Sequence, residues 1–240
     1  MRVVIAIFFL WILVFPITDW WVRFISRKAI NKESGTGAKV CLSFDDGPDQ
    51  RYTPEVLNIL KKFQVPALFF LVGAKAERFP DLVKRIEAEG HQIGSHTYFH
   101  RHAYLLSPWK SLKTITKGVQ ALEAIIKKPV VWFRPPWGAL NFFQYLWLRR
   151  LGLRILLWNA SARDWLKKTG ASGIMKLLLP KVRPHSIILL HDSGGEPGAP
   201  ANTIAALPGI IEKLQAAGYT FVTPEEILRE GSNHAKRRIS

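Results

Sequence analysis

The chain has 240 residues, of which 34 are lysine or arginine and 18 are aspartate or glutamate, so its formal net charge is +16. This length accommodates one sizeable core, such as a single-domain α/β barrel, and leaves little room for two compact domains. The charge favours an anionic neighbour, whether a phospholipid surface, an acidic polymer or a nucleic acid. The single cysteine, Cys41, excludes an intramolecular disulfide and a multi-cysteine zinc site, and its apolar neighbours predict a buried thiol.

The N-terminal segment is apolar from Val3 to Val22, with Thr18 and Asp19 as its clearly polar interruptions. About twenty apolar residues are enough for a helix to cross a bilayer. We therefore expect residues 1–22 to form a single-pass transmembrane anchor and residues 23–38 to form a linker. A cleaved signal sequence is the alternative interpretation, although no small-residue cleavage site is evident.

The charges flanking this segment predict its orientation. Only the amino terminus and Arg2 precede it, whereas four basic residues follow it: Arg23, Arg27, Lys28 and Lys32. Because positive charge is retained on the cytoplasmic side, this pattern places the main domain in the cytoplasm.

From Lys39 onward, short β-rich runs alternate with helical patterns. The predicted strands are residues 40–44, 67–72, 91–95, 130–133, 154–158, 186–190 and 219–222. Apolar residues recur at helical spacing in residues 53–64, 80–90 and 202–218, and the last two segments end at a glycine suited to a helix terminus. Strict alternation predicts a parallel α/β architecture over residues 39–229, followed by a solvated basic tail at 230–240.

Polar residues follow several of these strands. Asp45 and Asp46 follow the first strand, His96 and His100 the third, Arg134 the fourth, Asp164 the fifth, and His191 with Asp192 the sixth. In barrels of alternating strands and helices, the carboxyl ends of the strands meet at one face and form the active site. We therefore expect these side chains to gather there.

The segment HTYFH places two imidazoles four residues apart, so that His96 and His100 can approach one ion from a helical turn. Taken alone, two exposed histidines explain it equally well. Either Asp45 or Asp46 can complete a set of two histidines and one carboxylate, which suits Zn²⁺ or another divalent ion. The other carboxylate is then available to accept a proton from the attacking water.

A leaving amine must be protonated, and a histidine has an ordinary pKa near neutrality. His191 is the natural general acid on this ground. Asp164 is suited to hold and charge-stabilise its imidazole.

Five segments, SFDDGP, HTYFH, RPPWG, RDW and LLHD, occur in this order and resemble the successive motifs of the polysaccharide deacetylases, also called the NodB-homology or carbohydrate esterase family 4 domain. The resemblance extends from about Lys39 to Leu228. It implies a distorted (β/α)7-type barrel that removes N-acetyl groups from amino sugars with a divalent metal, zinc in the first place and cobalt, nickel or manganese as alternatives.

The resemblance also implies a role for ten residues. These are Asp45 as catalytic base; Asp46, His96 and His100 as metal ligands; Arg134 as the partner that orients Asp45; Trp137, whose backbone N–H would help to hold the oxyanion; His191 as the acid, tuned by Asp164; and Trp165 with Leu189 as the lining of the acetyl pocket.

Two positions depart from the family pattern. Ser161 stands where the family often has an acidic residue, three places before the Asp of RDW, so the tuning of His191 is expected to be simpler. Trp137 stands where a tyrosine is frequent. Because the backbone N–H, and not the side chain, would hold the oxyanion there, this change is expected to alter the shape of the pocket more than the chemistry.

Two substrate classes fit this resemblance. The first is an N-acetylated cell-envelope glycan such as peptidoglycan, processed outside the membrane, where the family is commonly found. The second is a lipid-linked amino sugar, deacetylated or deformylated at the membrane surface. The aromatic and basic run at residues 141–154 suits such an interface. An ordinary helix that packs Phe142, Leu146 and Leu148 inward is the simpler interpretation of that run.

Two interpretations without catalysis are also considered. One is a degenerate family member that binds sugar without turnover, but every metal and acid–base position is filled. The other is a basic membrane-bound scaffold or nucleic-acid binder. The ordered motifs argue against it, and no nucleic-acid partner is expected.

Overall fold

The computed structural model describes residues 38–228. The predicted anchor at 1–22 and the basic tail at 230–240 lie outside these residues, as does the linker except for its last residue. Within residues 38–228, none of the helices combines the length and the apolar character needed to cross a bilayer.

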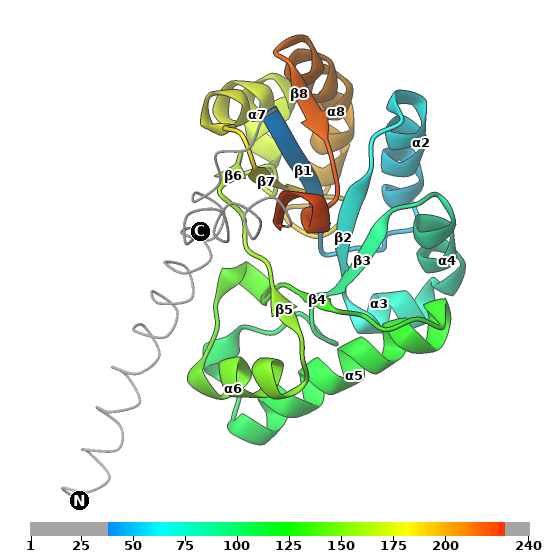
Figure 1. The fold of residues 1–240 in the computed structure, drawn as a ribbon, viewed down its shortest axis with the longest axis vertical. Coiled ribbons are helices and arrows are strands. Elements are labelled where there is room, and N and C mark those ends of the chain that lie inside the picture. Colours follow the sequence, from blue (N-terminus) through cyan, green and yellow to red (C-terminus); the bar gives the residue numbers. More distant parts are fainter. Residues whose placement is uncertain (1–37, 229–240) are drawn as a thin grey trace, which may run out of the picture.

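Eight strands form one parallel sheet, and helices surround it on the outside (Figure 1). The strands are β1 Ala38–Asp45, β2 Ala67–Leu71, β3 Gln92–Ser95, β4 Trp132–Phe133, β5 Arg154–Ile155, β6 Ala160–Ser161, β7 Ser186–His191 and β8 Tyr219–Phe221. The helices are α2 Thr53–Phe63, α3 Gly73–Arg78, α4 Pro80–Ala88, α5 Pro108–Ile126, α6 Phe142–Arg150, α7 Gly170–Leu178 and α8 Ala199–Ala216. Residues 224–228 are also helical.

The strands follow the order β5-β4-β3-β2-β1-β7-β6, and β8 pairs with the first residues of β1. No ladder within residues 38–228 joins β5 to β6, so the barrel is open between the two ends of this path. The expected seven-stranded alternation is wrong in one respect. β6 is an additional strand, and residues 156–159 connect it to β5 without a helix.

Alternation along the strands separates two apolar layers. In β1, Val40, Leu42 and Phe44 pack in the core between the sheet and the outer helices. Cys41 instead joins an inner cluster with Phe70 of β2. Because successive side chains point to opposite faces, Ser43 and Asp45 share the inner face with Cys41. Cys41 is fully buried, as predicted, and burial raises the pKa of its thiol to about 12.

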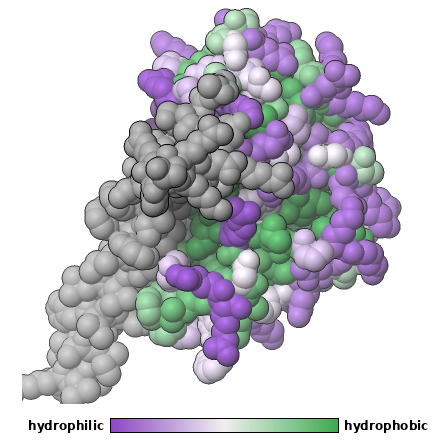
Figure 2. Space-filling view, in the orientation of Figure 1, coloured by the Kyte–Doolittle hydropathy of each residue, from purple (hydrophilic) through white to green (hydrophobic). Residues whose placement is uncertain are grey.

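The outer helices expose polar side chains in the orientation of Figure 2, while apolar side chains gather toward the middle of that view, where the strands lie.

The ends of three outer helices, α2, α4 and α8, follow ordinary capping rules. Pro54 lies in the first turn of α2, and Gly90 and Gly218 follow α4 and α8 with positive φ, as predicted.

Helix α6 corrects a prediction about the aromatic and basic run. A capping box between Asn141 and Gln144 begins this helix. Leu148 is fully buried, but Phe142 and Leu146 are exposed rather than packed inward.

Candidate active site

A cleft of about 620 Å³ opens where the inner face of the sheet ends. Eight of the ten predicted site residues line it: Asp45, Asp46, His96, His100, Trp137, Trp165, Leu189 and His191. The other two, Arg134 and Asp164, are fully buried and contact lining residues. Parallel strands thus bring these residues to one face, as the sequence predicts.

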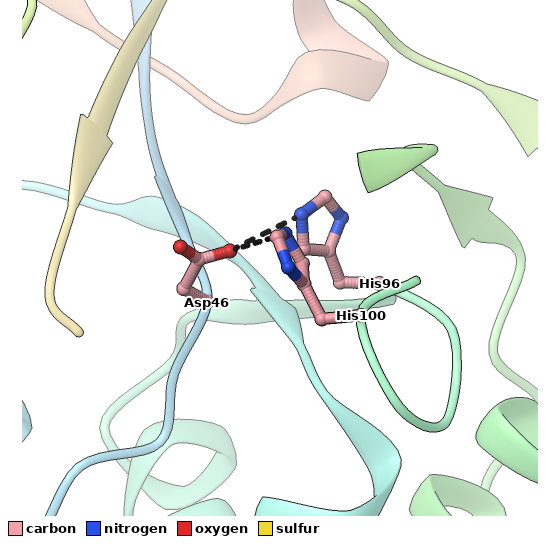
Figure 3. A group of neighbouring side chains, drawn as sticks. All are labelled: Asp46, His96 and His100. Carbon is pink, nitrogen blue, oxygen red and sulfur yellow. Dashed lines mark ion pairs between the residues drawn. The ribbon is translucent and has the colours of Figure 1, made fainter. Parts of the chain in front are cut away.

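Asp46, His96 and His100 converge within this cleft (Figure 3). The His100 Nε2 atom lies 2.9 Å from Asp46 Oδ1, and the His96 Nε2 atom lies 3.4 Å from the same oxygen. One atom from each residue can be chosen so that all three lie within 4.8 Å of one another. This donor set fits a divalent cation, since two imidazoles and one carboxylate leave positions open for water and substrate.

A buried contact fixes the tautomer of His96. Its Nδ1 atom lies 2.7 Å from the Arg134 carbonyl oxygen, which can only accept, so Nδ1 carries the proton and donates. Nε2 is then the ring atom that faces Asp46 and that can give its lone pair to a cation. Metal-binding histidines are commonly oriented by such a contact.

The loop that carries the two histidines is not the expected helical turn. Residues 96–100 are irregular, and both Thr97 and His100 have positive φ values, of 66° and 49°. This left-handed backbone turns His100 back toward Asp46. The backbone at Gly194 also approaches closely, because a Cβ atom added there would overlap Asp46 Oδ2. A glycine is therefore required at that position.

The charge of Asp46 is stabilised by its histidine neighbours. Burial acts to raise the pKa of this carboxyl, but His100 and His96, whose Nε2 atoms face Asp46 Oδ1, outweigh burial and hold the pKa well below its usual range. Asp46 is therefore an anion at every physiological pH, as a metal ligand must be.

Asp45 is oriented from behind by Arg134. The Arg134 guanidinium is completely buried and donates to Asp45 Oδ1 over 2.7 Å and to Ser43 Oγ over 2.9 Å. Its Nε donates to the Leu156 carbonyl, and the guanidinium stacks on the Phe70 ring. Asp45 Oδ2 remains on the side of the histidines, 3.8 Å from His96 Nε2. The two neighbouring aspartates thus have different partners.

His191 ends β7 and is held by Asp164. One Asp164 oxygen lies 3.1 Å from His191 Nδ1, and the other accepts the His191 backbone N–H over 2.6 Å and the Thr203 hydroxyl over 3.1 Å. Burial lowers the pKa of His191, but Asp164, with smaller contributions from Asp46 and Asp45, outweighs burial and raises the pKa to about 9. The imidazole is therefore protonated at neutral pH and able to donate.

Asp164 follows β6 and not the fifth strand. The sequence predicted it one strand too early, because β6 has only two residues and shows no recognisable pattern. The contact with His191 that it was predicted to make is present.

Aromatic rings border the cleft on two sides. Trp137, which is 55% exposed, packs against His100 with ring centroids 4.4 Å apart. Trp165 contacts His191 edge-on with centroids 5.6 Å apart. The φ of Trp137 is 56°, an uncommon conformation for a residue other than glycine. The role of its backbone N–H at an oxyanion stays a prediction.

Lys75 supports the site and was not predicted, whereas Asp192 was expected at this face but its partner was not. Lys75 of α3 lines the cleft and donates to the Asp46 carbonyl and to Ser193 Oγ, each over 2.7 Å. Asp192, fully buried, accepts the Thr53 hydroxyl over 2.6 Å, and burial raises the pKa of this carboxyl to about 7. Its position after His191 was noted from the sequence, but nothing there indicated its partner.

The comparison with known families agrees with this geometry. The sequence profile described as polysaccharide deacetylase matches residues 32–156, which is more than half of the chain. The chain belongs to the polysaccharide deacetylase family. This finding confirms the resemblance drawn from the five motifs.

Among curated family members, a peptidoglycan-N-acetylglucosamine deacetylase of Bacillus cereus is 37% identical over 79% of this chain and 88% of its own length. A chitooligosaccharide deacetylase of Sinorhizobium fredii is 36% identical over 78% of this chain and 90% of its own length. Both relatives are therefore similar over nearly their whole length.

Solved family structures share the fold. A peptidoglycan N-acetylglucosamine deacetylase in complex with 4-naphthalen-1-yl-N-oxidanyl-benzamide has a TM-score of 0.76 and 36% identity, and the alignment covers 80% of this chain and 88% of that one. A CE4 family pseudoenzyme from Bacillus anthracis has a TM-score of 0.74 and 26% identity, over 82% and 67% of the two chains. Activity therefore depends on the residues at the site and does not follow from the fold alone.

Proposed function

We propose that this chain is a metal-dependent hydrolase that removes N-acetyl groups from amino sugars of a cell-envelope glycan such as peptidoglycan. The observation that carries the proposal is the position of three separate groups in one cleft. These are a cation-binding trio, a carboxylate oriented by a buried arginine, and an imidazole paired with a buried carboxylate. The substrate class follows the named activities of the relatives.

The trio fits a metal by its chemistry. His96 is held as the tautomer that leaves Nε2 free, and Asp46 is anionic. A divalent cation bound there would acidify a water molecule and polarise the amide carbonyl of the substrate. Zinc is the proposed ion because it favours imidazole and carboxylate ligands, with cobalt, nickel or manganese as alternatives.

The protein's own groups supply the proton transfers. Asp45, oriented by Arg134, accepts the proton of the attacking water. His191, kept protonated by Asp164, donates a proton to the leaving amine. The Trp137 backbone N–H is proposed to stabilise the negative charge that develops on the carbonyl oxygen. Trp165 and Leu189 line the cleft and are proposed to receive the acetyl methyl group.

Acetate release from peptidoglycan tests this function. The purified full chain is treated with a chelator, assayed, and assayed again after addition of Zn²⁺. We expect activity to disappear with the metal and to return with it. A zinc-loaded protein that binds glycan and releases no acetate would contradict the proposal and identify a non-catalytic binder like the pseudoenzyme.

We further propose, from the sequence alone, that residues 1–22 anchor the chain in a membrane and that residues 23–38 connect the anchor to the catalytic domain. The flanking charges favour a cytoplasmic domain, whereas a peptidoglycan substrate requires the opposite side. Protease protection of the domain in intact cells, compared with lysed cells, decides between the two orientations.

A further inference from the structure

A second hollow, of about 310 Å³, lies beside the catalytic cleft, between the loop at residues 98–101 and helix α5. We call it the α5 groove. Phe99 lines both the groove and the catalytic cleft, and its side chain is 58% exposed. A substrate chain that passes over Phe99 can therefore occupy both hollows at once.

The lining of the α5 groove is strongly basic. It contains Arg101, Lys110, Lys113 and Lys117, and none of the described residues that line it carries a carboxylate. The three lysines recur at intervals of three and four residues, so they project from one face of α5. All four cations are exposed. Four like charges around one hollow raise the local concentration of anions.

These cations have few anionic partners of their own. Within residues 38–228, no ion pair involves Arg101, Lys110 or Lys113. The negative charge of Glu77 attracts the Lys117 ammonium group. The Glu77 carboxylate also accepts a hydrogen bond from the Tyr98 hydroxyl over 2.6 Å. Lys117 is thus partly balanced, and the other three remain available to an external anion.

Aromatic rings form part of the same groove. The Tyr98 ring is buried at its base, with Lys117 Nζ 3.8 Å from the ring centroid, and the Arg101 guanidinium lies 5.7 Å from the centroid of Phe99. An exposed aromatic ring can pack against an apolar surface of a ligand and remove it from water. The Phe99 ring can pack in this way against the apolar face of a sugar ring. The groove therefore combines a sugar platform with charges that recognise an acid.

We propose that the α5 groove is an anion-binding subsite that receives a carboxylate carried by the glycan whose amino sugar occupies the catalytic cleft. This proposal rests on the proposed deacetylase function and specifies its substrate. The enzyme then prefers an acidic glycan, such as one that contains muramic acid, to a neutral oligomer of N-acetylglucosamine. The concave shape and the shared Phe99 distinguish this occupant from a flat lipid surface.

The double variant Lys110→Gln/Lys113→Gln in the full chain tests the subsite. Its kcat/KM is measured on soluble muramic-acid-containing peptidoglycan fragments and on chitooligosaccharides of the same length. We expect kcat/KM on the acidic substrate to fall roughly five- to twentyfold, through KM, because two exposed ion pairs are lost. Activity on the neutral substrate should be unchanged, and the difference should shrink at high salt.

The matched control is Lys61→Gln/Lys62→Gln, which removes the same charge from exposed positions on α2. It should leave both substrates unaffected. Equal losses on both substrates in the α5 variant, or no loss on either, would overturn the subsite. An α5 variant that keeps its acidic-glycan kcat/KM but no longer binds phosphatidylglycerol vesicles would assign these cations to a membrane surface instead.

Failure of the proposed function is separable from failure of the subsite. If the wild-type chain releases acetate from neither substrate, calorimetric binding of peptidoglycan fragments before and after reduction of their carboxyl groups replaces the assay. The wild type should bind the carboxylated form more tightly, and the α5 variant should lose that preference. Equal affinity for the two forms in the wild type would refute the subsite.

Discussion

The two sides of the catalytic cleft hold their ionisable groups in opposite ways. On one side, two histidines surround the Asp46 carboxylate and hold its pKa well below the usual range. On the other side, the Asp164 carboxylate holds a histidine, and the pKa of His191 rises to about 9. The same pair of residue types thus gives a stabilised anion on the first side and a stabilised cation on the second. The surroundings of each pair, and not the residue types, therefore decide which group carries the stabilised charge.

The largest effect is expected from removal of a metal ligand. His96→Ala or His100→Ala should abolish metal retention and lower activity by roughly a thousandfold or more, because the water and the carbonyl both lose their activation. Metal content is measured by mass spectrometry beside acetate release. His102→Ala is the control, since His102 also packs near Trp137 but is not part of the trio. Unchanged metal content in both ligand variants would refute the assignment.

Asp45→Asn separates the two neighbouring aspartates. We expect the metal to remain bound and kcat to fall by about 10² to 10⁴, because the general base is lost while the ligands persist. Asp49→Asn is the matched control, since that side chain accepts the backbone N–H groups of Arg51 and Tyr52 and is not among the described residues that line the cleft. Loss of metal from Asp45→Asn would mean that the roles of Asp45 and Asp46 are exchanged.

His191→Ala tests the other side of the cleft. Turnover should fall by about 10² or more with the metal intact, because the leaving amine loses its proton donor. A substrate with a better leaving group should be affected less. Near-normal turnover on the amide substrate would exclude His191 as the acid.

Asp164→Asn should give the smallest change and the clearest dependence on pH. Because Asp164 raises the pKa of His191 to about 9, the acid form of the wild type persists until the pH passes that value. Loss of the carboxylate should move the alkaline limb of the kcat profile toward lower pH. The metal content should not change. If the alkaline limb of the kcat profile does not move, a group other than His191 determines its pKa.

The same pKa shift affects stability. The folded pKa of His191 lies above its unfolded value of about 6.5. The contribution of the His191–Asp164 pair to the free energy of unfolding is therefore fully present below about pH 6.5 and is lost as the pH rises through about 9. The difference in thermal stability between wild type and Asp164→Asn should therefore become smaller as the pH rises through this range.

The sequence predicted the gathering of polar residues because strand direction is a strong constraint. Once seven strands are parallel, residues at their carboxyl ends must meet, whatever the loops do. The unpredicted parts depend on local backbone. β6 is too short to show a periodicity, and the positive φ of Thr97 and His100 replaces a helical turn that the spacing alone suggested.

The role of Lys75 could not be predicted from the sequence for a different reason. It lies in a short helix that resembles many solvated helices, and no motif marks it. Only the packing of α3 beside the turn after β1 brings its ammonium group to the Asp46 carbonyl and Ser193. Contacts of this kind join segments that are 29 and 118 residues apart and leave no local pattern.

Strand β1 runs from Ala38 to Asp45, and the cleft opens at its carboxyl end. Seven residue steps of about 3.3 Å place the start of the strand roughly 23 Å from the reacting groups. Whatever precedes Ala38 therefore joins the domain at the end remote from the mouth of the cleft. An anchor of the kind proposed for residues 1–22 would therefore hold the domain from the end of β1 opposite to the cleft, and would leave the cleft open to a long substrate.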